Sequence, residues 1–241
     1  MKKRLDLILN GKGGVGKSFF AVNFIQFLKD RSIKHVAIDT DNENSTLKRF
    51  HSHANFLDLT TKSAVDPIFN ELKEQSLVVV DCRAASTDIF IRYFAKYEVF
   101  DVLKELDVAL TIVLPVNNDP DSLNQIQILT ENFGDKANYL VVKNRFFGEQ
   151  FKIYDNSKTR IRLLDELNGQ EIEMPLLDDW LVVGLNQAAT TITPALRSDK
   201  FVVMDRQRLV VWQRNFNAQL KLARDFLLPP KSLPKEKTNS P

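Results

Sequence analysis

Cysteine is almost absent: the 241 residues include a single one, Cys82. One thiol per chain excludes a disulfide within the chain and a Cys-x-x-Cys metal site, and it also excludes an iron–sulfur cluster shared two and two between chains. We expect Cys82 to be a small packed residue rather than a reactive thiol, in a reducing compartment.

Long apolar runs and an excess of one charge are also missing. No window approaches the roughly 18 continuous apolar residues of a membrane span, and the basic start is interrupted by Asp6 too early for a signal peptide. The 33 basic and 31 acidic residues give a net charge of +2, which excludes a chain-wide field of the kind that dedicated nucleic-acid binders carry. We therefore expect a cytoplasmic protein with no integral membrane segment, in which any DNA affinity comes from a local patch.

Short apolar runs alternate with stretches of helical period. The strand-like runs, the last of them weaker, are 5–10, 35–39, 77–81, 108–116, 138–144 and 171–175, and helical patterns cover 17–30, 86–105, 119–133 and 205–228. This alternation predicts an α/β fold: a single doubly wound, mainly parallel sheet flanked by helices. Asp119 is expected to cap the third helix, with Pro120 in its first turn. We expect one domain over 1–228 and a disordered tail rich in Pro and Lys over 229–241.

The last predicted helix has an apolar face and a basic face. The apolar stripe is Leu209, Trp212, Phe216, Leu220, Ala223 and Leu227, and the basic face is Arg206, Arg208, Arg214, Lys221 and Arg224. An outer helix needs a charged solvent face in any case, so the basic side is either ordinary solvation or a patch for non-specific DNA or an acidic partner.

Residues 11–18, GKGGVGKS, match the phosphate-binding motif G-x-x-x-x-G-K-[ST] between a predicted strand and a predicted helix. Glycines allow the backbone N–H groups to turn inward, and the helix N-terminus adds partial positive charge. We expect Lys17 to reach the β- and γ-phosphates and the Ser18 hydroxyl to ligate Mg²⁺. The nucleotide-binding residues predicted from this loop are Gly11, Gly13, Gly14, Val15, Gly16, Lys17, Ser18 and Phe19.

Acidic residues follow two later strands, at the sheet edge where ligands of parallel sheets bind. Asp81 ends LVVVD, a Walker B pattern, and we expect it to hold Mg²⁺, often through water. Asp39 and Asp41 follow the 35–39 run, two residues apart, so they are expected to point the same way.

The string KGGVGKS closely resembles the deviant Walker A motif of the ParA/MinD family. In that family a signature lysine crosses a nucleotide-dependent dimer interface and touches the partner's phosphates, and Lys12 matches its position. The resemblance implies an ATPase that forms a homodimer on binding ATP, with Lys12 acting in trans as an arginine finger does.

The same resemblance implies roles for other residues. Asp41 would orient the attacking water and Asp39 would lie near the magnesium ion; Asn144 would hydrogen-bond adenine, with Pro175 in the loop over the base. The segment that follows the predicted strand 138–144 lacks Asn-Lys-x-Asp, the pattern usual for guanine specificity, and this favours ATP over GTP. The chain departs from the family after both acidic strands, at residues 42–44 and at CRAAS (82–86), which leaves the geometry of both switch loops open.

Three strings, GKGGVGKS, IDTDNENSTL and MDRQRLVVWQR, are similar to TraL-type proteins of conjugative plasmids, with plasmid-stability StbB proteins as a related branch. This implies an ATP-dependent switch in conjugal transfer or plasmid stability and partition, with a plasmid-encoded protein partner or DNA. The motif begins at residue 11, so we expect no N-terminal helix-turn-helix. Two alternatives stay open: a membrane-surface positioning ATPase of the MinD type, against which the polar tail argues, and a small-molecule ligase or kinase that resembles dethiobiotin synthetase.

Two histidines, His51 and His53, stand close together in the sequence. At this spacing their side chains face apart on a helix, so we expect a solvated loop there rather than a metal pair.

Overall fold

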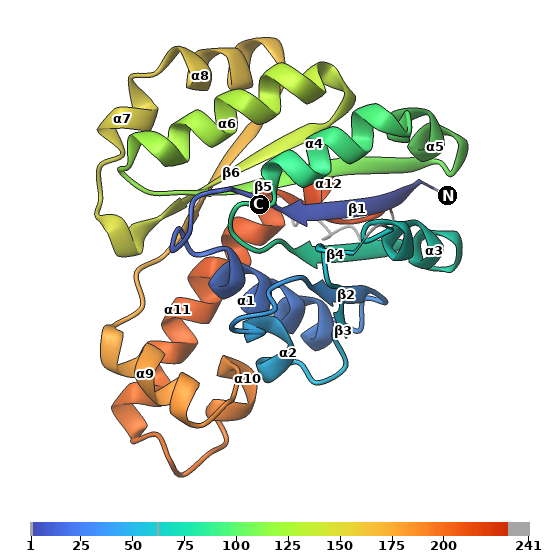
Figure 1. Cartoon of the computed structure of the whole chain (residues 1–241). Coiled ribbons are helices and arrows are strands. Elements are labelled where there is room, and N and C mark those ends of the chain that lie inside the picture. Colours follow the sequence, from blue (N-terminus) through green and yellow to red (C-terminus); the bar gives the residue numbers. More distant parts are fainter. Residues whose placement is uncertain (1, 62, 231–241) are drawn as a thin grey trace, which may run out of the picture.

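The computed structural model describes residues 2–61 and 63–230, and within them one parallel sheet of seven strands has the order β3-β2-β4-β1-β5-β6-β7 (Figure 1). The strands are β1 (Lys3–Ile8), β2 (Val36–Asp39), β3 (Asn55–Phe56), β4 (Leu77–Asp81), β5 (Val108–Val116), β6 (Asn138–Asn144) and β7 (Gln170–Met174). The predicted α/β fold with a doubly wound parallel sheet is confirmed. Residues 231–241 of the predicted tail lie outside the described residues.

Helices cover both faces of this sheet (Figure 1). They are α1 (Lys17–Asp30), α2 (Thr46–Phe50), α3 (Asp66–Glu74), α4 (Thr87–Lys96), α5 (Val99–Glu105), α6 (Pro120–Phe133), α7 (Lys152–Asp155), α8 (Lys158–Ile161), α9 (Asp179–Gln187), α10 (Ile192–Ala195), α11 (Val203–Leu222) and α12 (Arg224–Leu227), with a π-helical turn at Arg162–Glu166. The helices α9 and α10 and the first turns of α11 project from one side (Figure 1).

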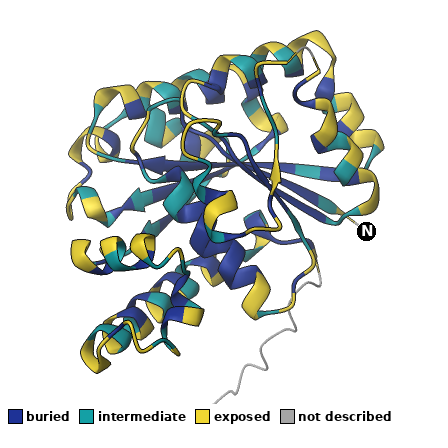
Figure 2. Ribbon diagram, turned by 60° about the horizontal axis from the view of Figure 1, so that its bottom comes forward, coloured by how far each residue is buried: buried dark blue, intermediate teal, exposed yellow. Residues whose placement is uncertain are grey.

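The central strands β4 and β5 are almost entirely apolar because both of their faces are buried. In β4, Val78 and Val80 pack with the layer of α3 to α6, whereas Leu77 and Val79 pack with the layer of α1 and α11. Figure 2 shows the result: most strand residues are buried, and most exposed residues lie on the outer sides of the helices and in loops.

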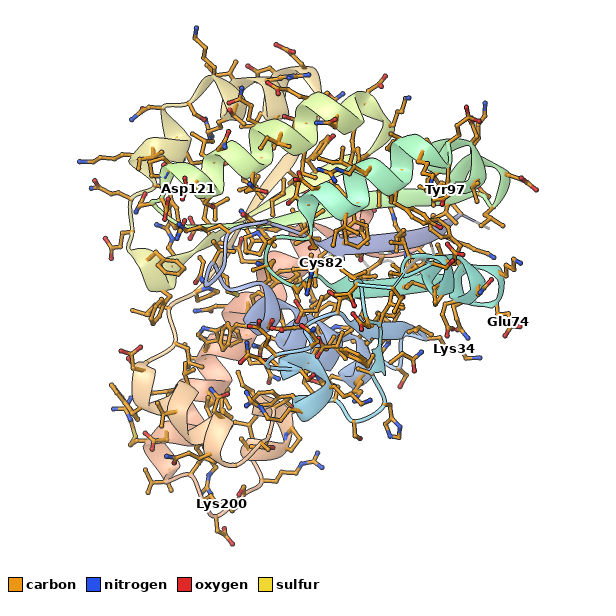
Figure 3. The ribbon with its side chains drawn as sticks, viewed as in Figure 1. Lys34, Glu74, Cys82, Tyr97, Asp121 and Lys200 are labelled. Carbon is orange, nitrogen blue, oxygen red and sulfur yellow. The ribbon has the colours of Figure 1, made fainter. Side chains whose placement is uncertain are left out.

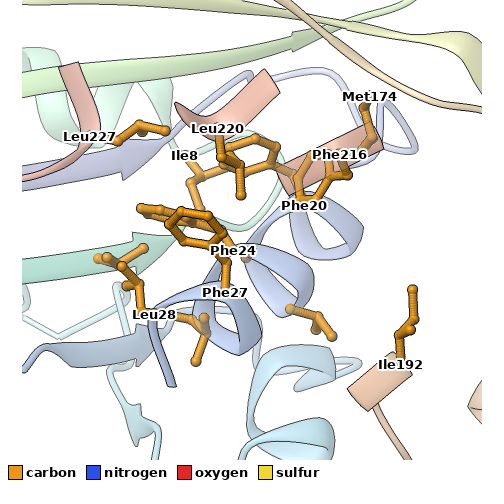
Figure 4. Packing of buried hydrophobic residues seen from close by; sticks show 14 of the residues in the cluster. Ile8, Phe20, Phe24, Phe27, Leu28, Met174, Ile192, Phe216, Leu220 and Leu227 are labelled. Carbon is orange, nitrogen blue, oxygen red and sulfur yellow. The ribbon is translucent and has the colours of Figure 1, made fainter. Parts of the chain in front are cut away.

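Aromatic side chains fill the core between α1 and α11 (Figure 4). Phe20 of α1 meets Phe216 of α11 edge to face with ring centroids 5.7 Å apart, and Phe19 meets Trp212 at 5.5 Å. The predicted apolar stripe of the last helix is buried along its whole length. This packing fixes α1, and therefore the loop before it, against the C-terminal helix.

Two predicted helices are divided. The segment 86–105 forms α4 and α5, because Glu98 takes a left-handed backbone conformation with φ of 50°. The segment 205–228 forms α11 and α12, which are separated at Ala223. Residues 119–133 form α6 as expected, and the Asp119 carboxylate accepts a hydrogen bond from the Asp121 N–H as its N-cap.

Candidate nucleotide site

The loop between β1 and α1 lies where the carboxyl ends of three neighbouring strands meet (Figure 1). Asp81 of β4 is in register with Ile8 of β1 and with Asp39 of β2, so both acidic positions flank the loop. Gly14 and Gly16 have φ of 75° and 101°, a region that favours glycine. A side chain at Gly16 would also approach the Asn144 amide nitrogen to 2.5 Å, so this position requires glycine.

A cavity of about 580 Å³ opens in front of this loop. Its lining brings together predicted residues from two segments, Gly13, Gly14, Gly16, Lys17, Ser18 and Phe19 from the loop and α1, and Asp41 from the segment after β2. The other predicted residues, Gly11, Lys12, Val15, Asp39, Asp81, Asn144 and Pro175, are not among those that line it.

The Lys17 side chain is buried inside the loop. Its Nζ donates a hydrogen bond of 2.8 Å to the Lys12 carbonyl, so the lysine follows the curve of the loop. Burial lowers the pKa of Lys17, and the charges of Asp81 and Asp41 oppose this shift. A buried ammonium at a helix N-terminus forms a phosphate-binding arrangement.

Asp81 is a buried carboxylate without a partner. Neither of its oxygens has a hydrogen-bond partner within the described part of the chain. Burial raises the pKa of Asp81 to about 7; the Ser18 hydroxyl and the Lys17 ammonium lie near enough to lower it, but by less. An orphaned carboxylate next to a hydroxyl is a donor set that fits Mg²⁺.

Mg²⁺ at this place would need further ligands. In the residues that the structure describes, no three His, Cys, Asp or Glu side chains converge on a point where they could hold a metal. This fits the usual behaviour of Mg²⁺, which takes one or two protein ligands and completes its shell with phosphate and water.

Asp39 and Asp41 organise the segment after β2. The two Asp39 oxygens accept from the N–H groups of Asp41 and Lys48, at 2.9 and 3.0 Å. Asp41 Oδ1 accepts from the N–H of Glu43 at 2.9 Å. The carboxylates therefore hold the backbone of this segment, and Asp41 also faces the cavity. Their roles toward magnesium and water stay predictions.

Lys12 turns away from the cavity, toward the start of α6. Its Nζ lies 2.9 Å from Asp119 Oδ2 and 2.9 Å from Asp121 Oδ2, and hydrogen bonds to these two carboxylates raise its pKa. Figure 3 labels Asp121 at this end of α6. The first lysine of the motif therefore lies at the protein surface, unlike Lys17.

Asn144 and Pro175 lie behind the loop. Asn144 Nδ2 donates to the Val15 carbonyl at 3.1 Å, and its Oδ1 accepts from the Phe146 N–H at 3.1 Å. The Pro175 carbonyl accepts from Trp212 Nε1 at 2.8 Å. Asn144 thus supports the phosphate loop directly, and the adenine contact stays a prediction.

The expectation of a solvated loop is wrong for His51. Its ring is buried against α1, with Nε2 2.8 Å from the Val22 carbonyl and Nδ1 3.0 Å from Lys29 Nζ. Burial lowers the pKa of His51 to about 4. His53 is exposed. The segment folds back on α1 after α2, and the local sequence pattern does not show such a long-range contact.

Sequence reasoning missed Arg83 as a lining residue of the cavity. Cys82, just before it, is buried as expected, and burial raises its pKa well above the ordinary value for a thiol (Figure 3). The departure from the family pattern directly after Asp81 was the available signal for Arg83.

The basic face of α11 is partly engaged within the chain. Arg208 pairs with Asp205 at 3.0 Å and with Asp178 at 3.9 Å, and Arg206 donates to the Ser198 carbonyl. Arg214 is exposed.

Comparison with known proteins places this site in a family. Residues 7–172 match the CobQ/CobB/MinD/ParA nucleotide binding domain. The chain is 26% identical to Protein MobD of Acidithiobacillus ferrooxidans over 220 residues, which cover 88% of this chain and 94% of that protein. It is 27% identical to Protein TraL of Escherichia coli over 241 residues, which cover 91% of this chain and 98% of that protein.

A solved structure shows the same fold. The septum site-determining protein MinD, complexed with Mg-ADP, from Pyrococcus horikoshii OT3 is similar with a TM-score of 0.54 at 13% identity, covering 93% of this chain and 99% of that chain. A parallel sheet with a phosphate-binding loop after its first strand defines a P-loop nucleotide-binding protein. The chain belongs to the CobQ/CobB/MinD/ParA family, which confirms the resemblance seen in its motifs. No helix within the described ranges combines the length and the apolar character needed to cross a membrane.

Proposed function

We propose that this protein is an ATPase that binds ATP with Mg²⁺, forms a homodimer in that state and acts as a switch in conjugal transfer or stable inheritance of a plasmid. The observation that carries the proposal is the buried Lys17 in a glycine-rich loop at a helix N-terminus, beside the unpartnered Asp81. The similarity to TraL and MobD supports the plasmid role.

The residues of the loop would hold the phosphates. Lys17 neutralises charge on the β- and γ-phosphates, and the backbone N–H groups at the start of α1 donate to their oxygens. Ser18 and Asp81 would hold Mg²⁺, which supplies further neutralisation of phosphate charge when it is bound. Asp41 faces the cavity and is our candidate for the residue that orients water.

Lys12 is our candidate for a contact in trans. Its Nζ lies at the surface rather than in its own cavity, and its side chain is 33% exposed. Exposed ion pairs such as those with Asp119 and Asp121 contribute little to stability. The phosphates of an ATP molecule bound to a second chain could therefore compete with these carboxylates for Lys12. The dimer would then depend on ATP because ATP supplies the competing anion.

Replacing Lys17 tests nucleotide binding. We expect Lys17→Ala to weaken ATP affinity at least about a hundredfold, because a buried charge-assisted contact contributes roughly 3 kcal/mol. Isothermal titration calorimetry with ATP and Mg²⁺ measures this. Lys34→Ala, which changes an exposed lysine before β2, is the matched control. Unchanged ATP affinity in Lys17→Ala would overturn the proposal.

A further inference from the structure

We propose that Arg83 binds the γ-phosphate from within the same subunit and so makes the site prefer ATP to ADP. This inference rests on the proposed function. Arg83 lies two residues after Asp81 and lines the same cavity as Lys17 and Ser18.

The backbone of Arg83 is held at the cavity wall by two hydrogen bonds, and a neighbouring contact ties this segment to the phosphate loop. Its N–H donates to Thr40 Oγ1 at 2.9 Å, and the Thr40 hydroxyl donates to the Asp81 carbonyl at 3.1 Å. The Arg83 carbonyl accepts from the Ser86 hydroxyl at 2.8 Å, at the start of α4. The nearby Ala85 N–H donates to the Gly11 carbonyl at 3.0 Å. These contacts join the segment after β4 to the phosphate loop and to the end of β2, so the base of the Arg83 side chain is fixed.

The guanidinium of Arg83 has an unmet donor. Its Nε is buried and has no hydrogen-bond partner among residues 2–61 and 63–230. Two hydrogen bonds from Thr60 and, to a smaller extent, the charge of Arg83 lower the pKa of the partly buried Asp58. A buried N–H without an acceptor is unfavourable, and the planar guanidinium fits phosphate oxygens with two parallel hydrogen bonds.

Charge balance favours a phosphate as the missing acceptor. The charged side chains that line the cavity are Lys17, Arg83, Asp41 and Glu43. Two cations and two acids cancel, whereas without Arg83 the lining would carry a net negative charge and would repel a triphosphate. Lys17 comes from the phosphate loop, and Arg83 comes from the separate wall formed by residues 82–85. A cation on a wall separate from the phosphate loop suits a phosphate beyond those that the loop holds, and ATP has one phosphate more than ADP.

The test compares a slowly hydrolysed triphosphate, ATPγS, with ADP. Calorimetry with Mg²⁺ would measure both affinities for the parental protein, Arg83→Gln, Arg83→Lys and the control Arg92→Gln, which changes an exposed arginine of α4. We expect Arg83→Gln to keep its ADP affinity within about twofold and to lose at least about tenfold in ATPγS affinity, as expected for a lost charge-assisted contact. Arg83→Lys should fall between, because it keeps the charge but loses the paired donors. Arg92→Gln should match the parent.

Two results would overturn the assignment while the proposed function stands. One is that Arg83→Gln prefers ATPγS over ADP to the same extent as the parental protein. The other is an equal loss of ADP and ATPγS affinity in both Arg83 variants, which would make Arg83 a support of the fold. A parental protein that binds neither nucleotide would overturn the proposed function itself, together with this inference.

Discussion

Asp81 is a site residue whose surroundings are unfavourable in the nucleotide-free chain. It is a buried carboxylate without a hydrogen-bond partner in the described residues, and burial raises its pKa to about 7. An acid with a raised folded-state pKa costs stability as pH rises from about 4, its unfolded value, to about 7, and the full cost remains above that. A pKa difference of about three between the folded and unfolded chain corresponds to a loss of at most roughly 4 kcal/mol in the free energy of unfolding.

We therefore expect Asp81→Asn to raise the melting temperature of the nucleotide-free protein at pH 8, because the variant has no charge to bury. The same variant should lose the extra stabilisation that Mg²⁺ adds to bound ATP. Differential scanning calorimetry measures both, with the exposed Asp165→Asn as control. A lower melting temperature for nucleotide-free Asp81→Asn would contradict the reading of Asp81 as an unpaired ligand.

His51 should make the fold sensitive to acid. Its pKa is lowered to about 4, first by burial and then by the charges of Lys29 and His35, against an ordinary value of 6.5. A base with a lowered folded-state pKa loses stability as pH falls from about 6.5 to about 4, because the unfolded chain binds the proton first. The loss between pH 7 and pH 5 should be about 2 kcal/mol.

Urea unfolding of the parent and of His51→Gln at both pH values checks this. Asp81 acts in the opposite sense over this range, so the difference between the two proteins is the relevant quantity. His51→Gln should lose less stability than the parent on acidification. An equal loss in both proteins would show that His51 is not buried in its neutral form.

Individual residues were predictable from the sequence where the prediction depends on a local motif. Lys17 and Ser18 follow from an eight-residue pattern, and the predicted Asp119 cap is confirmed. The partners of Lys12 and the burial of His51 could not be predicted, because Asp121 and Val22 are distant in the sequence and meet these residues only in the folded chain.

Among the elements, strands buried on both faces were predictable because apolar runs of strand length are distinctive. The two-residue edge strand β3 was missed, since it is too short to give an apolar run of strand length and both of its residues are exposed. The break between α4 and α5 was missed because the helical period continues through Glu98, and a left-handed glutamate is uncommon.

The helix α11 offers a test of DNA binding. We propose that its basic face binds DNA without sequence preference in the ATP state, with the exposed Arg214 and Lys221 among its contributors. Replacing both contributors by Ala should weaken binding and lower the salt slope of log K by about 2, since each phosphate contact contributes roughly 0.9.

Fluorescence anisotropy with a labelled duplex over a salt series gives this slope. The double variant Lys34→Ala with Lys96→Ala removes the same charge elsewhere and should match the parent. Affinity that does not change with salt in the parental protein would contradict the DNA patch and would favour a protein partner.

For the whole molecule, the fold and the family followed from the order of motifs along the chain: a phosphate loop, an Asp-x-Asp and a Walker B strand. The strand order then places Asp39 and Asp81 on neighbouring strands in direct register. A dimer could not be predicted from periodicity, because its contacts involve a second chain. The proposed dimer rests on Lys12, whose ammonium lies outside the cavity of its own chain and pairs with Asp119 and Asp121.

Light scattering after gel filtration, with ATP and Mg²⁺, tests the proposed ATP-dependent dimer in the parent, Lys12→Ala and Asp41→Asn. Asp41→Asn retains an oxygen that can accept from Glu43, so it should keep the segment after β2 in place. We expect the parent to shift from monomer to dimer, and Asp41→Asn to stay dimeric because hydrolysis is slow. Lys12→Ala should bind ATP as a monomer and lose turnover, since the cation in trans is gone. A Lys12→Ala protein that dimerises and hydrolyses ATP at the parental rate would contradict the role of Lys12 in trans.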